Sequence, residues 1–117
     1  MNNDRKCRYD IVGLSGELDV PVEELKELYD TYLSELDEQI QSMYDLEKAK
    51  DWHMLERTVH NLKGMSQTVF VYDIYQEAVT LDDFLKKDIT ENAHKLIENI
   101  DEISKETRKE ILSFFRN

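Results

Sequence analysis

Hydrophobic residues recur along this chain at intervals of three and four positions, and they do not alternate with polar residues as in a strand. Such a spacing places the hydrophobic side chains on one face of a helix. The predicted elements are a short helix at about residues 10–18 and four long helices at about 21–47, 51–69, 73–86 and 90–114. Because the connections between them are short, the pattern predicts an all-α fold: an antiparallel up-down-up-down four-helix bundle with a short N-terminal helix.

The second long helix has the most regular stripe. Its inward positions are separated by steps of 3, 4, 3, 4 and 3 residues: Trp52, Leu55, Val59, Leu62, Ser66 and Val69. Asp51 precedes the stripe and can cap this helix, and Pro21 suits the first turn of the helix before it. Only three glycines and one proline occur, and only Gly64 lies beyond Pro21, so the long helices are expected to be uninterrupted.

The composition fits one compact domain. The chain has 117 residues, of which 40% are hydrophobic and 35% charged, enough for one core under a charged surface. We expect a single domain over residues 1–117, with a flexible N-terminus at 1–9. The longest apolar run, at 69–72, is far shorter than the roughly 20 residues that span a bilayer, and no secretion signal is recognisable. A cytoplasmic, monomeric protein is expected, and Met1 favours a freestanding one.

Charge and cysteine content exclude several classes of function. Lys and Arg number 15 and Asp and Glu 26, a formal net charge of −11 that would repel a nucleic-acid backbone. Cys7 is the only cysteine, so neither a disulfide within the chain nor a CxxC motif is possible. His53 and His60 are seven residues apart with no set of cysteines or carboxylates to complete a zinc site, so no metal site is expected.

The polar flank of the second long helix carries the candidate chemistry. Glu56, His60, Lys63, Gly64 and Gln67 follow one another there at intervals that keep them on one side. A glycine inside a helix costs about 1 kcal/mol relative to alanine, so Gly64 indicates that a partner surface needs room beside the imidazole of His60. The flank is convex and has no enclosing loop, which favours an exposed phosphoryl group over a small substrate in a cleft.

The segment His60-Asn61-Leu62-Lys63-Gly64-Met65-Ser66 resembles the His-x-Leu-Lys-Gly-x-Ser segment of histidine-containing phosphotransfer (HPt) domains. Residues 10–14, 22–25, 51 and 81–82 also follow that family's layout, so the resemblance covers nearly the whole chain. It implies that His60 accepts a phosphoryl group from a sensor histidine kinase or a receiver-domain aspartate and passes it to a response-regulator aspartate. Such a protein is a phosphoryl carrier rather than a self-sufficient enzyme. It needs no cofactor, and Mg²⁺ is expected only on the partner receiver domain.

The resemblance also implies roles for individual residues. Lys63 would balance the phosphoryl charge. The family places a polar side chain 22 residues after the histidine, here Asp82, where it can accept a hydrogen bond from Nδ1 of His60. This would leave the Nε2 lone pair of a neutral imidazole free to attack phosphorus. Ser66 is expected to serve packing, with its hydroxyl bonded to a carbonyl of its own helix.

Many family members have a glycine ten residues after the histidine, where this chain has Phe70. Phe70 either prolongs the histidine helix toward Tyr72, with Asp73 capping the next helix, or belongs to the core. The residues expected to dock a partner are Glu56, Arg57, Gly64, Gln67 and Phe70. The alternative function is a non-catalytic helical adaptor that binds a signalling partner without phosphotransfer. The two functions differ at His60, because only the carrier depends on its imidazole.

Overall fold

The computed structural model describes residues 7–116, which form an all-helical bundle without strands. The elements are α1 (Ile11–Leu18), the 3-10 turn η1 (Val22–Glu24), α2 (Leu25–Lys48), α3 (Trp52–Thr68), α4 (Tyr72–Lys86) and α5 (Ala93–Arg116). A short helix and four long ones were predicted from the spacing, and all five are present. None of the helices in the described part has an apolar stretch long enough to cross a membrane.

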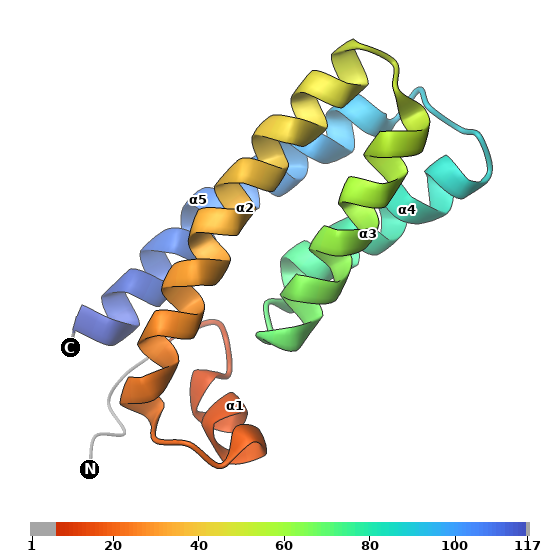
Figure 1. The fold of residues 1–117 in the computed structure, drawn as a ribbon. Coiled ribbons are helices and arrows are strands. Elements are labelled where there is room, and N and C mark those ends of the chain that lie inside the picture. Colours follow the sequence, from red (N-terminus) through yellow and green to blue (C-terminus); the bar gives the residue numbers. More distant parts are fainter. Residues whose placement is uncertain (1–6, 117) are drawn as a thin grey trace.

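The four long helices differ in length, and this difference explains the position of α1. Helices α2 and α5 have 24 residues each, or about 36 Å, whereas α3 has 17 and α4 has 15. Helix α3 packs against α2 and α4, and α5 packs against α4 and α2. Figure 1 shows α1 below the turn between α3 and α4, beside the first part of α2. Ile11 and Leu14 of α1 are buried there, at the end of the bundle that the shorter helices leave uncovered.

The inward stripe of α3 fixes which of its faces is exposed. Leu55, Val59, Leu62 and Ser66 have no exposed surface, as their spacing predicts. Asp51 caps the helix by accepting a hydrogen bond from the backbone N–H of Met54 at 3.3 Å, which confirms the predicted cap. The side of α3 opposite this stripe therefore faces solvent.

The helices α1 to α4 all end without glycine. A residue in the left-handed backbone conformation follows each of them: Asp19, Lys50, Phe70 and Asp88, with φ of 56°, 59°, 66° and 59°. Glycine is the usual residue at this position, because a Cβ is strained there. The chain therefore makes tight turns between its helices although glycine is almost absent after α1.

Phe70 closes α3 instead of prolonging it. Its backbone N–H donates to the carbonyl of Gln67 at 3.2 Å, and the N–H of Val71 donates to the carbonyl of Ser66 at 2.9 Å. These two bonds form a Schellman motif. Of the two alternatives for Phe70, the extension of the helix toward Tyr72 is wrong, since α3 ends at Thr68 and α4 begins at Tyr72, whereas the packing of Phe70 against the core is confirmed. Asp73 consequently lies in the first turn of α4 and not at its cap.

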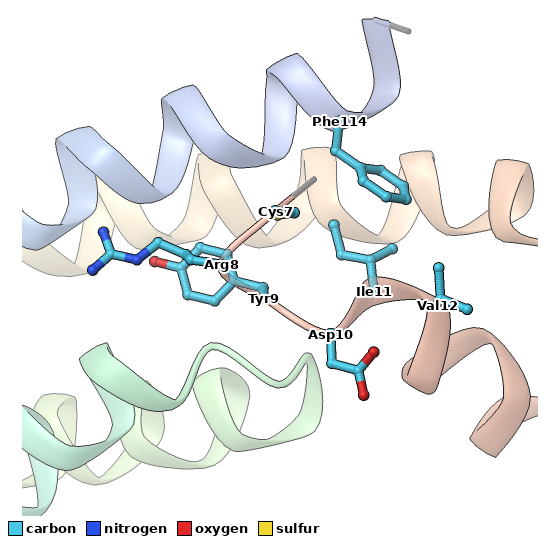
Figure 2. Close-up of a pocket in the computed structure, with 7 residues that line it drawn as sticks. All are labelled: Cys7, Arg8, Tyr9, Asp10, Ile11, Val12 and Phe114. Atoms are coloured by element: carbon cyan, nitrogen blue, oxygen red, sulfur yellow. The ribbon is translucent and has the colours of Figure 1, made fainter. Parts of the chain in front are cut away.

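The segment before α1 is packed between α5 and α4. Tyr9 is buried, and its hydroxyl lies 2.6 Å from Oγ1 of Thr107 and donates to Asp73 at 3.1 Å. Residues 7–12 and Phe114 line a hollow of about 260 Å³, and Figure 2 shows the side chain of Phe114 close to that of Ile11. Residues 7–9 of the terminus expected to be flexible thus have contacts with α4 and α5 through Tyr9. Residues 1–6 lie outside the described residues.

Candidate functional site

His60 lies in the middle of α3 on its exposed side. Two hydrogen bonds from α2 fix the rotation of α3 about its axis. The hydroxyl of Tyr29 donates to the carbonyl of Val69 at 2.7 Å, and the hydroxyl of Tyr32 lies 2.8 Å from Oγ of Ser66. Ser66 thus has a packing role as expected, but its hydrogen-bond partner is a tyrosine on another helix. Because both contacts are buried, they hold the imidazole of His60 toward solvent.

Two cationic residues flank His60, one on each side of it around the helix axis. With about 100° per residue, Arg57 and Lys63 project about 60° to either side of it. A shallow hollow of about 350 Å³ adjoins His60 and is lined by His53, Glu56, Arg57, His60 and Asn61. Within residues 7–116, neither the imidazole of His60 nor the guanidinium of Arg57 has a hydrogen-bond or ion-pair partner, and both residues are exposed.

Lys63 is paired with a buried carboxylate on α4. Its ammonium lies 2.8 Å from Oδ2 of Asp82. The ammonium of Lys86 lies 2.9 Å from the same oxygen. The resemblance implies that Lys63 balances the phosphoryl charge on His60, whereas in this structure its ammonium is paired with Asp82. Lys86 was not among the predicted residues, although it follows Asp82 by one helical turn, a spacing that allows an ion pair.

The charge of this cluster follows from the state of Asp82. The side chain has no exposed surface, and its burial is the largest influence on its pKa and opposes ionisation. The hydrogen bonds and charges of Lys63 and Lys86 together outweigh burial and lower the pKa of Asp82. One carboxylate thus faces two ammonium groups, and the carboxylates of Glu56 and Asp83 also act on the ammonium of Lys86.

The second oxygen of Asp82 is an unused acceptor. Oδ1 is buried and has no hydrogen-bond partner in the described part of the chain. No hydrogen bond joins Asp82 to His60 among residues 7–116. A buried carboxylate oxygen without a donor carries a free-energy cost of about 1–3 kcal/mol, so a donor at this position would be stabilised.

The predicted docking residues lie on or next to the same flank. Arg57, Gly64 and Gln67 are exposed, whereas Glu56 and Phe70 are half-buried. A Cβ added to Gly64 would meet no atom within 4 Å, so no neighbour in the bundle requires this glycine. The ring of Phe70 packs against the core and also stacks on Tyr72 with a centroid distance of 5.5 Å. Tyr72 is 47% exposed and adds an aromatic surface that the sequence analysis did not identify.

No group of three or more His, Cys, Asp or Glu side chains suited to a metal ion occurs within residues 7–116.

Comparison with known protein families gives a match that includes the residues of this site. A family model described as Hpt domain matches residues 27–110, which run from the first turn of α2 into α5 and include His60, Lys63, Asp82 and Lys86. Neither a curated protein nor a solved structure matches the chain.

Proposed function

The chain belongs to the Hpt domain family, the phosphotransfer domains of phosphorelays, and we propose that it carries a phosphoryl group on His60 between two signalling proteins. The observation that carries the proposal is the imidazole of His60, which is exposed and unpartnered within the described residues. A donor or acceptor domain can reach such a group directly. No cleft is required, because the partner supplies the remainder of the reaction site.

The proposed chemistry is a direct displacement at phosphorus. The Nε2 lone pair of neutral His60 attacks the phosphoryl group of a receiver aspartate or of a kinase histidine, while the bond to the donor atom breaks. The ring keeps its Nδ1 proton and becomes a phosphorylated imidazolium. The lone pair of a neutral imidazole is itself the nucleophile, so no base is needed to activate it.

Asp82 and Lys63 are proposed to support this step. Oδ1 of Asp82 lacks a donor, and it is the acceptor that would hold the proton on Nδ1 of His60. Lys63 would balance the phosphoryl charge once its ammonium leaves Oδ2 of Asp82. Lys86 supports that exchange, because its ammonium remains 2.9 Å from the same oxygen and keeps the buried carboxylate neutralised.

The proposed partners are a sensor histidine kinase and a response-regulator receiver domain, with Mg²⁺ held by the receiver. Gly64 supports docking over the flank, because the space beside it is open. Arg57 and Gln67 are exposed on the same helix as Gly64, and Phe70 and Tyr72 stack on each other after the end of that helix. A monomer in the cytoplasm and an up-down-up-down order of the four long helices are proposed as well. The packing of α2 on α3, α3 on α4 and α4 on α5 supports that order.

A helical adaptor is the second candidate function. Stacked Phe70 and Tyr72, with 47% of Tyr72 exposed, favour partner binding that needs no chemistry. An adaptor would bind its partner equally well without the imidazole of His60. The two functions therefore make opposite predictions for His60→Gln.

Phosphorylation of the purified chain tests the proposal. The protein is incubated with a phosphorylated receiver domain or with phosphoramidate, and its intact mass is measured before and after acid and base treatment. We expect one added phosphoryl group that is stable in base, lost in acid and absent from His60→Gln. Circular dichroism of both proteins controls for folding.

Transfer onward completes the test. Purified phosphorylated protein is mixed with an unphosphorylated receiver domain, and loss of the label from His60 is followed together with its gain by the receiver. A folded protein that accepts no phosphoryl group from either donor would contradict the carrier function. Unchanged partner binding by His60→Gln in that case would establish the adaptor.

A further inference from the structure

The two cationic residues that flank His60 differ in whether they have an ion-pair partner. Lys63 is 2.8 Å from the buried carboxylate of Asp82, and its side chain is only 23% exposed. Arg57 is exposed and has no ion-pair or hydrogen-bond partner within residues 7–116. The free cation beside the imidazole is therefore Arg57.

Arg57 also has the geometry to reach a group on His60. It lies three residues before His60, which places the two side chains as neighbours on the helix surface. Both line the hollow of about 350 Å³ on this side of α3. Asn61 lines the same hollow and offers an amide donor. The carboxylate of Asp82 on α4 is paired with Lys63 and Lys86, so it does not compete for the guanidinium.

We propose that Arg57 binds the phosphoryl group on His60 directly, from the side of the imidazole opposite Lys63. This assignment rests on the proposed function and deepens it. A guanidinium presents paired N–H donors that match two oxygens of a phosphoryl group, and it stays charged at every relevant pH. Arg57 thus contacts the transferred group before Lys63 has to leave Asp82.

The transfer from a small donor defines what Arg57 acts on. The Nε2 lone pair of His60 forms a bond to the phosphorus of phosphoramidate. The donor reacts in the form in which its nitrogen is protonated (–NH3⁺), so that when the P–N bond breaks, ammonia leaves with the electron pair of that bond. Negative charge on the phosphoryl oxygens is present throughout, and the guanidinium of Arg57 stabilises it in the transition state and in the product. The transfer from phosphoramidate to His60 requires no metal ion and no further reactant.

Phosphoramidate separates phosphoryl binding from protein docking, because it has no surface to dock. We compare initial phosphorylation rates, from intact mass, for the full chain and for Arg57→Gln, Arg57→Lys and Lys95→Gln. Lys95 is exposed on α5 and is the control for the loss of one positive charge from an acidic protein. His60→Gln gives the background, and circular dichroism checks helix content.

We expect Arg57→Gln to react about fivefold more slowly, which corresponds to about 1 kcal/mol for an exposed charged contact. Arg57→Lys should recover part of the rate, since it keeps the charge but loses the paired donors. Lys95→Gln should react like the unchanged protein. Added salt should slow the unchanged protein more than Arg57→Gln, because salt screens the contact that the variant lacks.

Two results would overturn the assignment. An unchanged rate for Arg57→Gln excludes phosphoryl contact, and slower transfer only from a receiver domain would then identify Arg57 as a docking residue. Equal slowing of Arg57→Gln and Lys95→Gln would assign the effect to overall charge. The failure of the proposed function has a different signature, because in that case the folded, unchanged protein gains no phosphoryl group on His60 at all.

Discussion

Phe70 offers a direct test of how α3 ends. Its φ of 66° lies in the left-handed region, where a residue with a Cβ is strained by about 1–2 kcal/mol. Glycine avoids this strain, although its greater freedom in the unfolded chain costs about 0.5–1 kcal/mol. Phe70→Ala and Phe70→Gly both remove the ring that stacks on Tyr72, so their difference reports the backbone alone. We expect the glycine variant to be more stable by about 1 kcal/mol.

The measurement is urea unfolding followed by circular dichroism, with each variant fitted at the same slope. A difference of about 1 kcal/mol corresponds to a shift in Tm of about 4 °C for a domain of this size. Glu35 is the control, because it is exposed within α2. At that right-handed position the order must reverse, with Glu35→Ala more stable than Glu35→Gly by about 1 kcal/mol.

The reasoning is refuted if Phe70→Ala is as stable as Phe70→Gly, or more stable, while the control pair behaves as expected. That result would mean that residue 70 is not left-handed. The Schellman hydrogen bonds from Phe70 and Val71 would then be absent as well, and α3 would continue toward Tyr72.

Two further predictions concern the titrating groups. Asp82→Asn should lower the free energy of unfolding at pH 7 by about 1–3 kcal/mol and slow phosphorylation of His60. Because the folded-state pKa of Asp82 is lowered, the difference in unfolding free energy between the two proteins should be full above about pH 4, the ordinary range of an aspartate. It should shrink as the pH falls through the lowered pKa. A difference in urea unfolding that does not change with pH would contradict this prediction. The hydrogen bond of His94 to Glu47, 2.9 Å long, raises the pKa of His94. The stabilisation of the folded state by this hydrogen bond should be full below about pH 6.5 and should be lost as the pH rises through the raised pKa. His94→Gln should therefore match the unchanged protein in stability only at high pH. Equal destabilisation by His94→Gln at all pH values would contradict this prediction.

The sequence predicted the helices because their cores are local patterns. The inward stripe of α3 repeats at three and four residues, and burial against α2 and α4 follows from it. The end of α3 was not predictable in the same way. Phe70 has no intrinsic preference for a left-handed conformation, and that conformation is imposed by the requirement to join two packed helices. The glycine common at this position in the family was the available signal for a positive φ.

The candidate site was predictable only in part, for a related reason. The placement of His60 and Gly64 on one flank depends on helix periodicity alone. The contact of Lys63 with Asp82 depends on how α3 packs against α4, which no spacing within one helix determines. The sequence nevertheless contained a signal for this ion pair, because an acidic residue beside the inward position Leu81 needs cationic partners if it is buried. Lys86, one helical turn later, is the nearest cationic residue in the sequence.

Two local costs lie close to the flank of α3 that carries His60, one in the glycine at position 64 and one in the unpaired Oδ1 of Asp82. Gly64 costs about 1 kcal/mol in a helix interior, although no neighbouring atom excludes a side chain there. Asp82 is buried with one oxygen lacking a donor, whereas an apolar residue at that position would pack without this cost. Stability alone explains neither residue. A partner that closes over Gly64 and an imidazole N–H that completes Asp82 would explain both, and these two events belong to one reaction at His60.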